Sequence, residues 1–204
     1  AADENLLNST RSTDFISPKS KVSKLFRDST LELSRDYHFA EKLVNSGRLS
    51  DAAFLEHSSL NTADEDRFEG NMVPGAVMDD APIEGDNQER WALNVFGNGF
   101  QLLYFVDNAN ALDEQTARQL LSLQQGALSV EPIVVATSGT APQGIRTVLD
   151  IKGMLAQRYD AQNGTCYLAR PDQHVAARWK TLNVDKVIAA LSTATCNPEI
   201  LNRA

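Results

Sequence analysis

The amino-acid sequence predicts an α/β fold in which a central mixed sheet is flanked by helices and preceded by a helical segment. Two continuous apolar runs, at 100–106 and 132–137, are typical of buried parallel strands. Segments with helical spacing separate and follow these runs. A Pro-Asp turn at 171–172 lies between two short apolar segments and indicates a β-hairpin.

The first 45 residues are expected to be helical. Apolar side chains share one helix face at Val22, Leu25, Phe26 and Leu33. Pro18 precedes this helix, and Ser17 or Ser20 can cap its start. A second short helix is expected to end at Gly47. Residues 1–15 begin without a cap, which suggests the tail of a longer helix.

Residues 46–89 are expected to be an acidic linker. Between 51 and 89 the acidic residues face a single base, Arg67. Such a run is usually a solvated connector, and an acidic docking surface is the alternative. The stretch 71–86 has no helical period, so we expect an extended segment held to a surface by its few apolar side chains.

Residues 90–204 are expected to contain the sheet. In order, we expect a strand at 100–106, a helix capped by Asp113 and ended by Gly126, a strand at 132–137, a helix at 147–159, strands at 166–169 and 174–178, and a helix at 184–192. The order β-α-β-α-β-β-α describes a thioredoxin-like sandwich. The spacing alone also leaves another small α/β fold open.

Thiol redox chemistry is not expected. In a thioredoxin-like fold a CxxC motif follows the first central strand, where a helix N-terminus lowers the pKa of one thiol. Residues 107–115 occupy that place and contain no cysteine. Cys166 and Cys196 are expected to be buried free thiols in a reducing cytoplasm.

The sequence predicts no catalytic, cofactor-binding or metal-ligating residue. The glycine turn at 97–99 lacks the third glycine of a dinucleotide loop, and the loop at 137–144 lacks the Lys-Ser/Thr ending of a phosphate cradle. The histidines are isolated from one another: His38, His57 and His174. An unrecognised site at 137–144, or at the hairpin with Asp172 and His174, stays an alternative.

Charge and hydropathy limit the partners. The net charge of −8 argues against nucleic acid, because phosphate contacts need a basic face. No apolar run approaches the roughly 20 residues that span a bilayer. Trp91 and Trp179 lie at strand margins and are candidate anchors of a protein interface. Leu25 and Phe26 are candidates on the helical segment.

Two stretches resemble a known family. "WALNVFGNGFQLLYF" and "CYLARPDQHVAAR" resemble the C-terminal region of FAD-dependent aromatic-ring monooxygenases, the phenol hydroxylase and 3-(3-hydroxyphenyl)propionate hydroxylase group. In that group a glycine hairpin opens a thioredoxin-like domain and an Arg-Pro-Asp turn closes its sheet. The resemblance covers nearly all of the chain: residues 1–20 look like the end of the flavoprotein's long helix.

The resemblance implies an organisation and a function. Residues 1–45 would be the helical tail of an upstream FAD- and substrate-binding domain, 46–89 the acidic linker, and 90–204 a thioredoxin-like domain without CxxC. The parent enzyme would use FAD and NAD(P)H to hydroxylate a phenolic ring in the cytoplasm. The family's flavin motifs lie upstream, so no catalytic or FAD-contacting residue carries over to this chain.

The expected role of the chain is therefore structural. It is expected to be inactive alone, to bind neither FAD nor NAD(P)H, to pack on the upstream domain, and to contribute to a homodimer. The alternative is a free-standing, redox-inactive thioredoxin-like module that binds other proteins.

Overall fold

A computed structural model describes residues 2–41, 43, 53–85 and 87–202. The chain divides into two compact units, Ala1–Ala53 and Phe54–Ala204, and each unit is described by itself. This division falls between the predicted boundaries at 45 and 89. Residues 54–85 and 87–89 therefore belong to the same unit as the sheet, although we expected them to form a linker.

The first unit is helical, as the sequence predicted. It contains α1 (Ala2–Ile16), α2 (Lys21–Leu33) and α3 (His38–Glu41). Of the two candidate caps, Ser20 is the one used, because its hydroxyl accepts a hydrogen bond from the Ser23 amide at 3.0 Å. The predicted stop at Gly47 lies outside the described residues. Among those described in this unit, only Ser12, Thr30 and Ala40 are buried, so the helices have no apolar core of their own.

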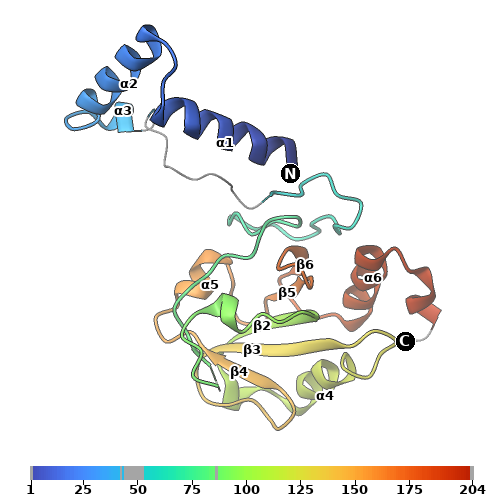
Figure 1. Ribbon diagram of the computed structural model, residues 1–204. Helices are drawn as coiled ribbons and strands as arrows, with labels where there is room; N and C mark the ends of the chain where they lie inside the picture. Colours follow the sequence, from blue (N-terminus) through green and yellow to red (C-terminus); the bar gives the residue numbers. More distant parts are fainter. Residues whose placement is uncertain (1, 42, 44–52, 86, 203–204) are drawn as a thin grey trace. The chain divides into compact units, whose positions relative to one another are not determined.

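The second unit contains a mixed six-stranded sheet in the order β1-β4-β3-β2-β5-β6 (Figure 1). The strands are β1 (Glu84–Gly85), β2 (Phe100–Asn108), β3 (Val130–Ser138), β4 (Arg146–Leu149), β5 (Cys166–Ala169) and β6 (Val175–Trp179). β2, β3 and β4 run parallel. β5 is antiparallel to both β2 and β6, and β1 is antiparallel to β4.

The thioredoxin-like sandwich is confirmed. Helix α4 (Glu114–Ser122) joins the parallel strands β2 and β3, and α6 (Val184–Thr195) follows the hairpin of β5 and β6. Asp113 caps α4 as predicted, because its carboxylate accepts a hydrogen bond from the Thr116 amide at 2.9 Å. The helix ends at Ser122, one turn before the predicted stop at Gly126.

The predicted helix at 147–159 is wrong in its first half. Residues 146–149 form β4, and the helix α5 spans only Met154–Arg158. Thr147 and Val148 pair with two β-branched residues of β3, which favours a strand. Gly153 has a φ of +64° and separates the two elements. The apolar spacing was misleading, because Ile151, which shares that spacing, is 56% exposed.

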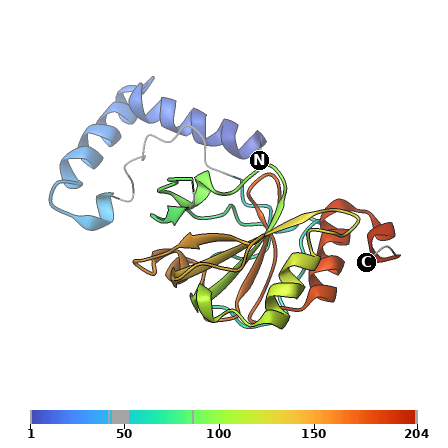
Figure 2. The same cartoon turned by 90° about the horizontal axis from the view of Figure 1, so that it is seen from below.

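The sheet has two apolar faces because side chains alternate along each strand. Leu102, Val134 and Leu168 face α4 and α6. Leu103, Val135 and Tyr167 face the opposite side, which is covered by α5 and by apolar residues from the chain segment 72–96. Figure 2 shows α4 and α6 side by side. Helices and an extended segment thus form the outer layers.

The segment before the sheet covers the β6 edge. Its backbone forms hydrogen bonds with that strand: Thr62 N donates to Ala176 O at 2.9 Å, and Gly75 N donates to Val175 O at 2.8 Å. Val77 and His174 form an isolated antiparallel bridge. An open sheet edge is a template for pairing with other chains. Residues of the predicted linker therefore protect this edge.

A buried ion pair fixes this segment. The Arg178 side chain on β6 is only 3% exposed, and its Nε and Nη2 atoms donate to the Asp64 carboxylate at 3.0 and 2.6 Å. The Arg178 guanidinium carbon lies 4.3 Å from the centre of the Phe68 ring, and the Lys180 ammonium lies 4.0 Å from it. We call Asp64, Phe68, Arg178 and Lys180 the clasp.

Breaking the clasp is expected to destabilise the second unit. Arg178→Met leaves Asp64 without its cation and should lower the free energy of unfolding by about 2–4 kcal/mol. Denaturant unfolding of the whole chain measures this change. Adding Asp64→Leu to Arg178→Met should restore part of the loss.

Lys186→Ala provides the matched control for the clasp. Lys186 pairs with Glu65 of the same segment, but both side chains are largely exposed, so little change is expected. A loss in Arg178→Met no larger than in Lys186→Ala would contradict the assigned role.

Candidate functional site

The position of thioredoxin redox chemistry contains polar, non-thiol side chains. It is the β2–α4 junction, where Asn108 accepts a hydrogen bond from the Asn110 amide at 3.0 Å and Asp113 caps the helix. Cys166 lies in β5, fully buried, and burial raises the pKa of its thiol. A buried thiol with a raised pKa is a poor nucleophile. Cys166 is therefore a core residue, as predicted.

The prediction for the second cysteine is wrong. Cys196 is exposed instead of buried. It is the C-cap of α6 and adopts a left-handed conformation with a φ of 51°. This conformation ends the helix at the surface and directs the chain away from the core.

The glycine-rich loop at 137–144 packs against protein groups. Gly139 has a φ of +84°, and a Cβ atom there would lie 2.5 Å from the Asn108 amide oxygen. The Thr140 amide donates to the Asn110 side chain at 3.0 Å. An anion cradle needs open space and free amides. The interpretation of this segment as a loop holds for residues 139–144, whereas Thr137 and Ser138 end strand β3.

The hairpin turn between β5 and β6 is held by charge. Arg170 donates to the Asp172 carboxylate at 3.1 and 2.5 Å. Burial opposes ionisation of Asp172, but the hydrogen bonds and charge of Arg170 keep its pKa below the ordinary value. The His174 amide also donates to Asp172, at 3.3 Å. These contacts close the turn, which is a structural role.

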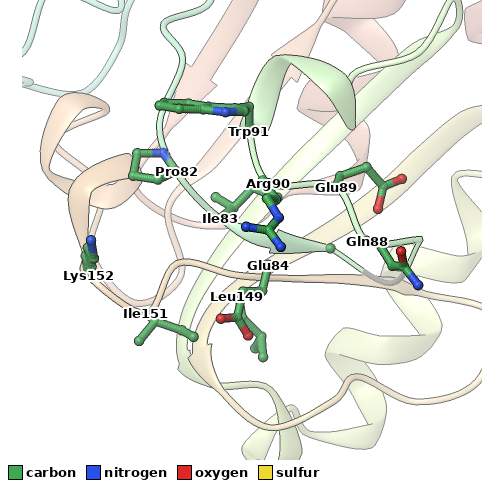
Figure 3. A pocket seen from close by; sticks show the side chains of 11 residues that line it. Pro82, Ile83, Glu84, Gln88, Glu89, Arg90, Trp91, Leu149, Ile151 and Lys152 are labelled. Atoms are coloured by element: carbon green, nitrogen blue, oxygen red, sulfur yellow. The ribbon is translucent and has the colours of Figure 1, made fainter.

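The candidate functional site is an open hollow of about 810 Å³ beside β1, which we call the edge pocket. Pro82, Glu84, Arg90, Trp91, Ile151 and Lys152 are among the residues that line it. Figure 3 shows Trp91 and Pro82 at one side of the pocket, Ile151 at the other, and the Arg90 side chain between them. The pocket thus has apolar ends, and its lining carries two basic side chains, Arg90 and Lys152, and two acidic ones, Glu84 and Glu89.

A tight turn builds the edge pocket. The Ile83 amide donates to Arg90 O at 2.9 Å, and the Gly85 amide donates to Glu89 O at 3.0 Å. Pro82 and Trp91 form an antiparallel bridge. On its other side β1 pairs with β4, which brings Leu149 and the residues after it to the pocket.

Glu89 connects this turn to the sheet through an ion pair. Its carboxylate forms an ion pair with Arg146 of β4 and accepts a hydrogen bond from the Asn87 amide at 2.8 Å. Arg146 also donates to Val95 O at 3.2 Å. Burial would raise the pKa of Glu89, but backbone hydrogen bonds and the charge of Arg146 hold it below the ordinary value.

The edge pocket offers a contact surface. Trp91 is 50% exposed and Ile151 is 56% exposed, beside two basic and two acidic side chains. Exposed apolar side chains rimmed by polar groups favour contact with another surface. The sequence singled out Trp91 but missed Ile151, which we placed in a helix, and Pro82 and Arg90, which lie at the boundary of the expected linker.

The other interface candidates fall in different places. Trp179 is only 3% exposed and packs in the core beneath α6, so its indole is not at the surface that an interface needs. Leu25 and Phe26 on α2 are 68% and 57% exposed. Their role, like that of Trp91, stays a prediction.

In the part of the chain that the structure describes, no helix is long and apolar enough to cross a bilayer. Within the same residues, His, Cys, Asp and Glu side chains do not gather in groups of three or more that could hold a metal ion.

A known protein family matches most of the sheet domain in sequence. The model of the HcaD C-terminal domain matches residues 82–194. No curated protein matches the chain in sequence. Several solved structures are similar in shape, and two of them are much longer than this chain.

The similar structures include two flavoproteins and a peroxidase. Aklavinone-11 hydroxylase, solved with FAD and aklavinone, is 21% identical over 72% of this chain and 26% of its own, with a TM-score of 0.47. The flavin-dependent monooxygenase PieE, solved with FAD and substrate, is 18% identical over 98% of this chain and 36% of its own, with a TM-score of 0.47. Thiol peroxidase from Chromobacterium violaceum is 15% identical over 65% of this chain and 90% of its own, with a TM-score of 0.47. We infer no function from likenesses of this size.

Thiol accessibility is expected to differ sharply between the two cysteines. In the native chain at about pH 8, Cys196 should react quickly with a disulfide reagent such as DTNB. Cys166 should react at least about a thousandfold more slowly, because it must wait for rare opening. Stopped-flow absorbance measures both phases. A fast phase that persists in Cys196→Ser would contradict the burial of Cys166.

Glu89 is expected to make stability depend on pH. Its pKa in the folded chain lies below the ordinary 4.5, so its ionised form adds stability that is complete above that value. This stability is lost as the pH falls through the folded-state pKa. Glu89→Gln should therefore be less stable than wild type at about pH 7, by a margin that shrinks at about pH 3.

Denaturant unfolding at the two pH values measures that margin. Glu84→Gln is the matched control, because Glu84 is exposed and lines the same pocket. A margin for Glu89→Gln that is equal at both pH values would rule out the ion pair as its source.

Proposed function

The chain belongs to the HcaD C-terminal domain family, a C-terminal domain of flavin monooxygenases, and we propose that it is the C-terminal part of an FAD- and NAD(P)H-dependent aromatic hydroxylase. The substrate class is phenolic, as the sequence resemblance implies. The reaction takes place in an upstream domain of the same polypeptide. This chain supplies structure to that enzyme and no catalytic group.

The residues present do not fit FAD. A dinucleotide site needs a glycine-rich turn that opens a helix, so that amides meet the pyrophosphate. Here the turn at 97–99 opens strand β2, and the glycine loop at 137–144 is filled by Asn108 and Asn110. The edge pocket is an open surface hollow beside a two-residue strand. We therefore derive no catalytic step for this chain.

The observation that carries the proposal is the exposure of the helical unit. Large apolar side chains of α1 to α3 and the chain between them are at least 42% exposed: Leu6, Leu7, Ile16, Val22, Leu25, Phe26, Leu31, Leu33, Tyr37 and Phe39. Helices with such faces and no core need a partner to be stable in water. The proposed partner is the FAD-binding domain upstream in the same polypeptide.

The sheet domain has a supporting role in this proposal. Its β2–α4 junction lacks a thiol, and its buried Cys166 is inert, so the proposal assigns it no thioredoxin-type disulfide exchange. The exposed Trp91 in the edge pocket is the proposed contact in a cytoplasmic homodimer. Exposed aromatic side chains of this kind often anchor interfaces.

The reading frame before the Ala1 codon provides the first test. A continuation that encodes a strand, a GxGxxG turn and a helix would support the proposal. The full polypeptide should then bind FAD and oxidise NAD(P)H in the presence of phenols. A start codon immediately before Ala1 would instead favour a free-standing module that binds other proteins.

The apolar face of α2 is expected to dock on the flavin domain. In the full polypeptide, Leu25→Glu with Phe26→Glu should weaken docking by about 2 kcal/mol or more, which is more than tenfold. FAD retention after gel filtration and limited proteolysis after residue 20 measure the loss. Lys24→Glu, an exposed charge reversal on the same helix, is the control. Equal FAD retention in the double variant and the control would contradict the assigned face.

A further inference from the structure

A small cavity lies at the carboxyl ends of two central strands. It has a volume of about 50 Å³. Asp107 of β2, Thr137 of β3 and Asp150, which follows β4, border it together with Gln162 and Asn163 of the loop before β5. Ligands of open α/β sheets bind outside the carboxyl ends of the strands. The cavity thus occupies a place that suits a ligand.

Asp150 is the unusual group in this cavity. Asp150 is only 1% exposed. One carboxylate oxygen, Oδ2, accepts a hydrogen bond from the Ala156 amide at 2.8 Å. The other, Oδ1, is buried and has no hydrogen-bond partner among the described protein groups. A buried carboxylate is strongly unfavourable unless it is paired and hydrogen-bonded.

The described residues that line the cavity include no basic side chain to compensate this charge. The residues that line the cavity include two carboxylates, Asp107 and Asp150, and no Lys, Arg or His. Two other carboxylates in the unit differ from Asp150 in this respect: Asp64 forms an ion pair with Arg178, and Glu89 forms one with Arg146. The potential inside the cavity is therefore negative and favours a cation.

The remaining polar groups supply oxygen atoms. The Thr137 hydroxyl donates to Asp107 O at 2.6 Å and keeps its own lone pairs free to coordinate. Asn163 contributes an amide oxygen, which accepts a hydrogen bond from the Asp107 amide at 3.4 Å. Carboxylate, hydroxyl and amide oxygens are the ligands of hard cations. A water needs only about 10–15 Å³, so an ion with a water fits the cavity.

We propose that this cavity binds one hard, oxygen-liganded cation through the free oxygen of Asp150, with Asp107, Thr137 and Asn163 around it. The cation neutralises a carboxylate that the protein leaves unpaired. It also joins the ends of β2 and β3 to the turn before α5. Its effect is to stabilise the sheet domain, and this inference does not depend on the flavin-linked function proposed above.

Thermal unfolding of the chain tests the proposal. The chain is treated with EDTA and kept in tetramethylammonium chloride, whose cation is too large for the cavity. CaCl2, MgCl2 or KCl then replaces that salt at constant ionic strength. At least one of them should raise the Tm saturably, by about 3 °C or more. The absence of a saturable rise with all three salts would overturn the proposal.

Variants locate the effect. Asp150→Asn keeps an oxygen for the Ala156 amide but removes the charge, so the rise should disappear, while the Tm without metal should not fall. Asp185→Asn, an exposed carboxylate at the start of α6, should keep the full rise. A rise that survives in Asp150→Asn would place the cation elsewhere and overturn the proposal.

A second variant covers a failure of Asp150→Asn to fold. Asp107 is exposed at the border of the cavity, so Asp107→Asn should fold normally and should shift the midpoint of the metal titration upward by about tenfold. An unchanged midpoint in Asp107→Asn, with the titration followed by calorimetry, would equally count against the site.

Discussion

The segment before the sheet is held in place because it compensates the buried charge of Arg178. Arg178 is in β6, the last strand of the sheet, and its guanidinium is almost completely buried. A buried cation must be paired and hydrogen-bonded. Asp64 provides a two-point carboxylate contact, Gly70 provides a carbonyl at 3.3 Å, and Phe68 provides a ring face. Each of these partners comes from the same incoming segment.

The clasp therefore determines what the acidic stretch does. Because Asp64 is held, the following residues lie where Gly75 and Val77 can pair with the start of β6. Met72, Met78 and Ile83 then reach the second face of the sheet and bury their side chains there. The chain continues into the tight turn of the edge pocket, which Glu89 and Arg146 fix to β4. A stretch that looked like a solvated linker supplies both edge protection and part of a core.

This construction fits a domain that supports chemistry located elsewhere. The junction that holds thiols in redox-active relatives of the fold contains Asn108 and Asp113, which satisfy backbone amides. The loop after β3 is packed, and both lateral edges of the sheet are paired with neighbouring chain. The candidate contact surface of the second unit is the edge pocket with Trp91. In the first unit it is the apolar face that includes Leu25 and Phe26.

Local rules in the sequence by themselves determined four of the strands, β2, β3, β5 and β6, and two helix starts. Apolar runs predicted β2 and β3, Asp113 predicted one helix start, Ser17 or Ser20 predicted another, and the Arg-Pro-Asp turn predicted the last hairpin. These features depend on neighbouring residues, so they can be predicted from the sequence. The absence of a cysteine at 107–115 likewise excluded thiol chemistry there.

Only the tertiary structure decided the features that depend on partners far along the chain. These are the strand at 146–149, which exists because it pairs with β3; the burial of Trp179; the pairing of Asp64 with Arg178; and the edge pocket, which joins residues 82–91 to 149–152. Pairing and burial are settled by residues that lie close in space, and spacing along the chain does not encode that proximity.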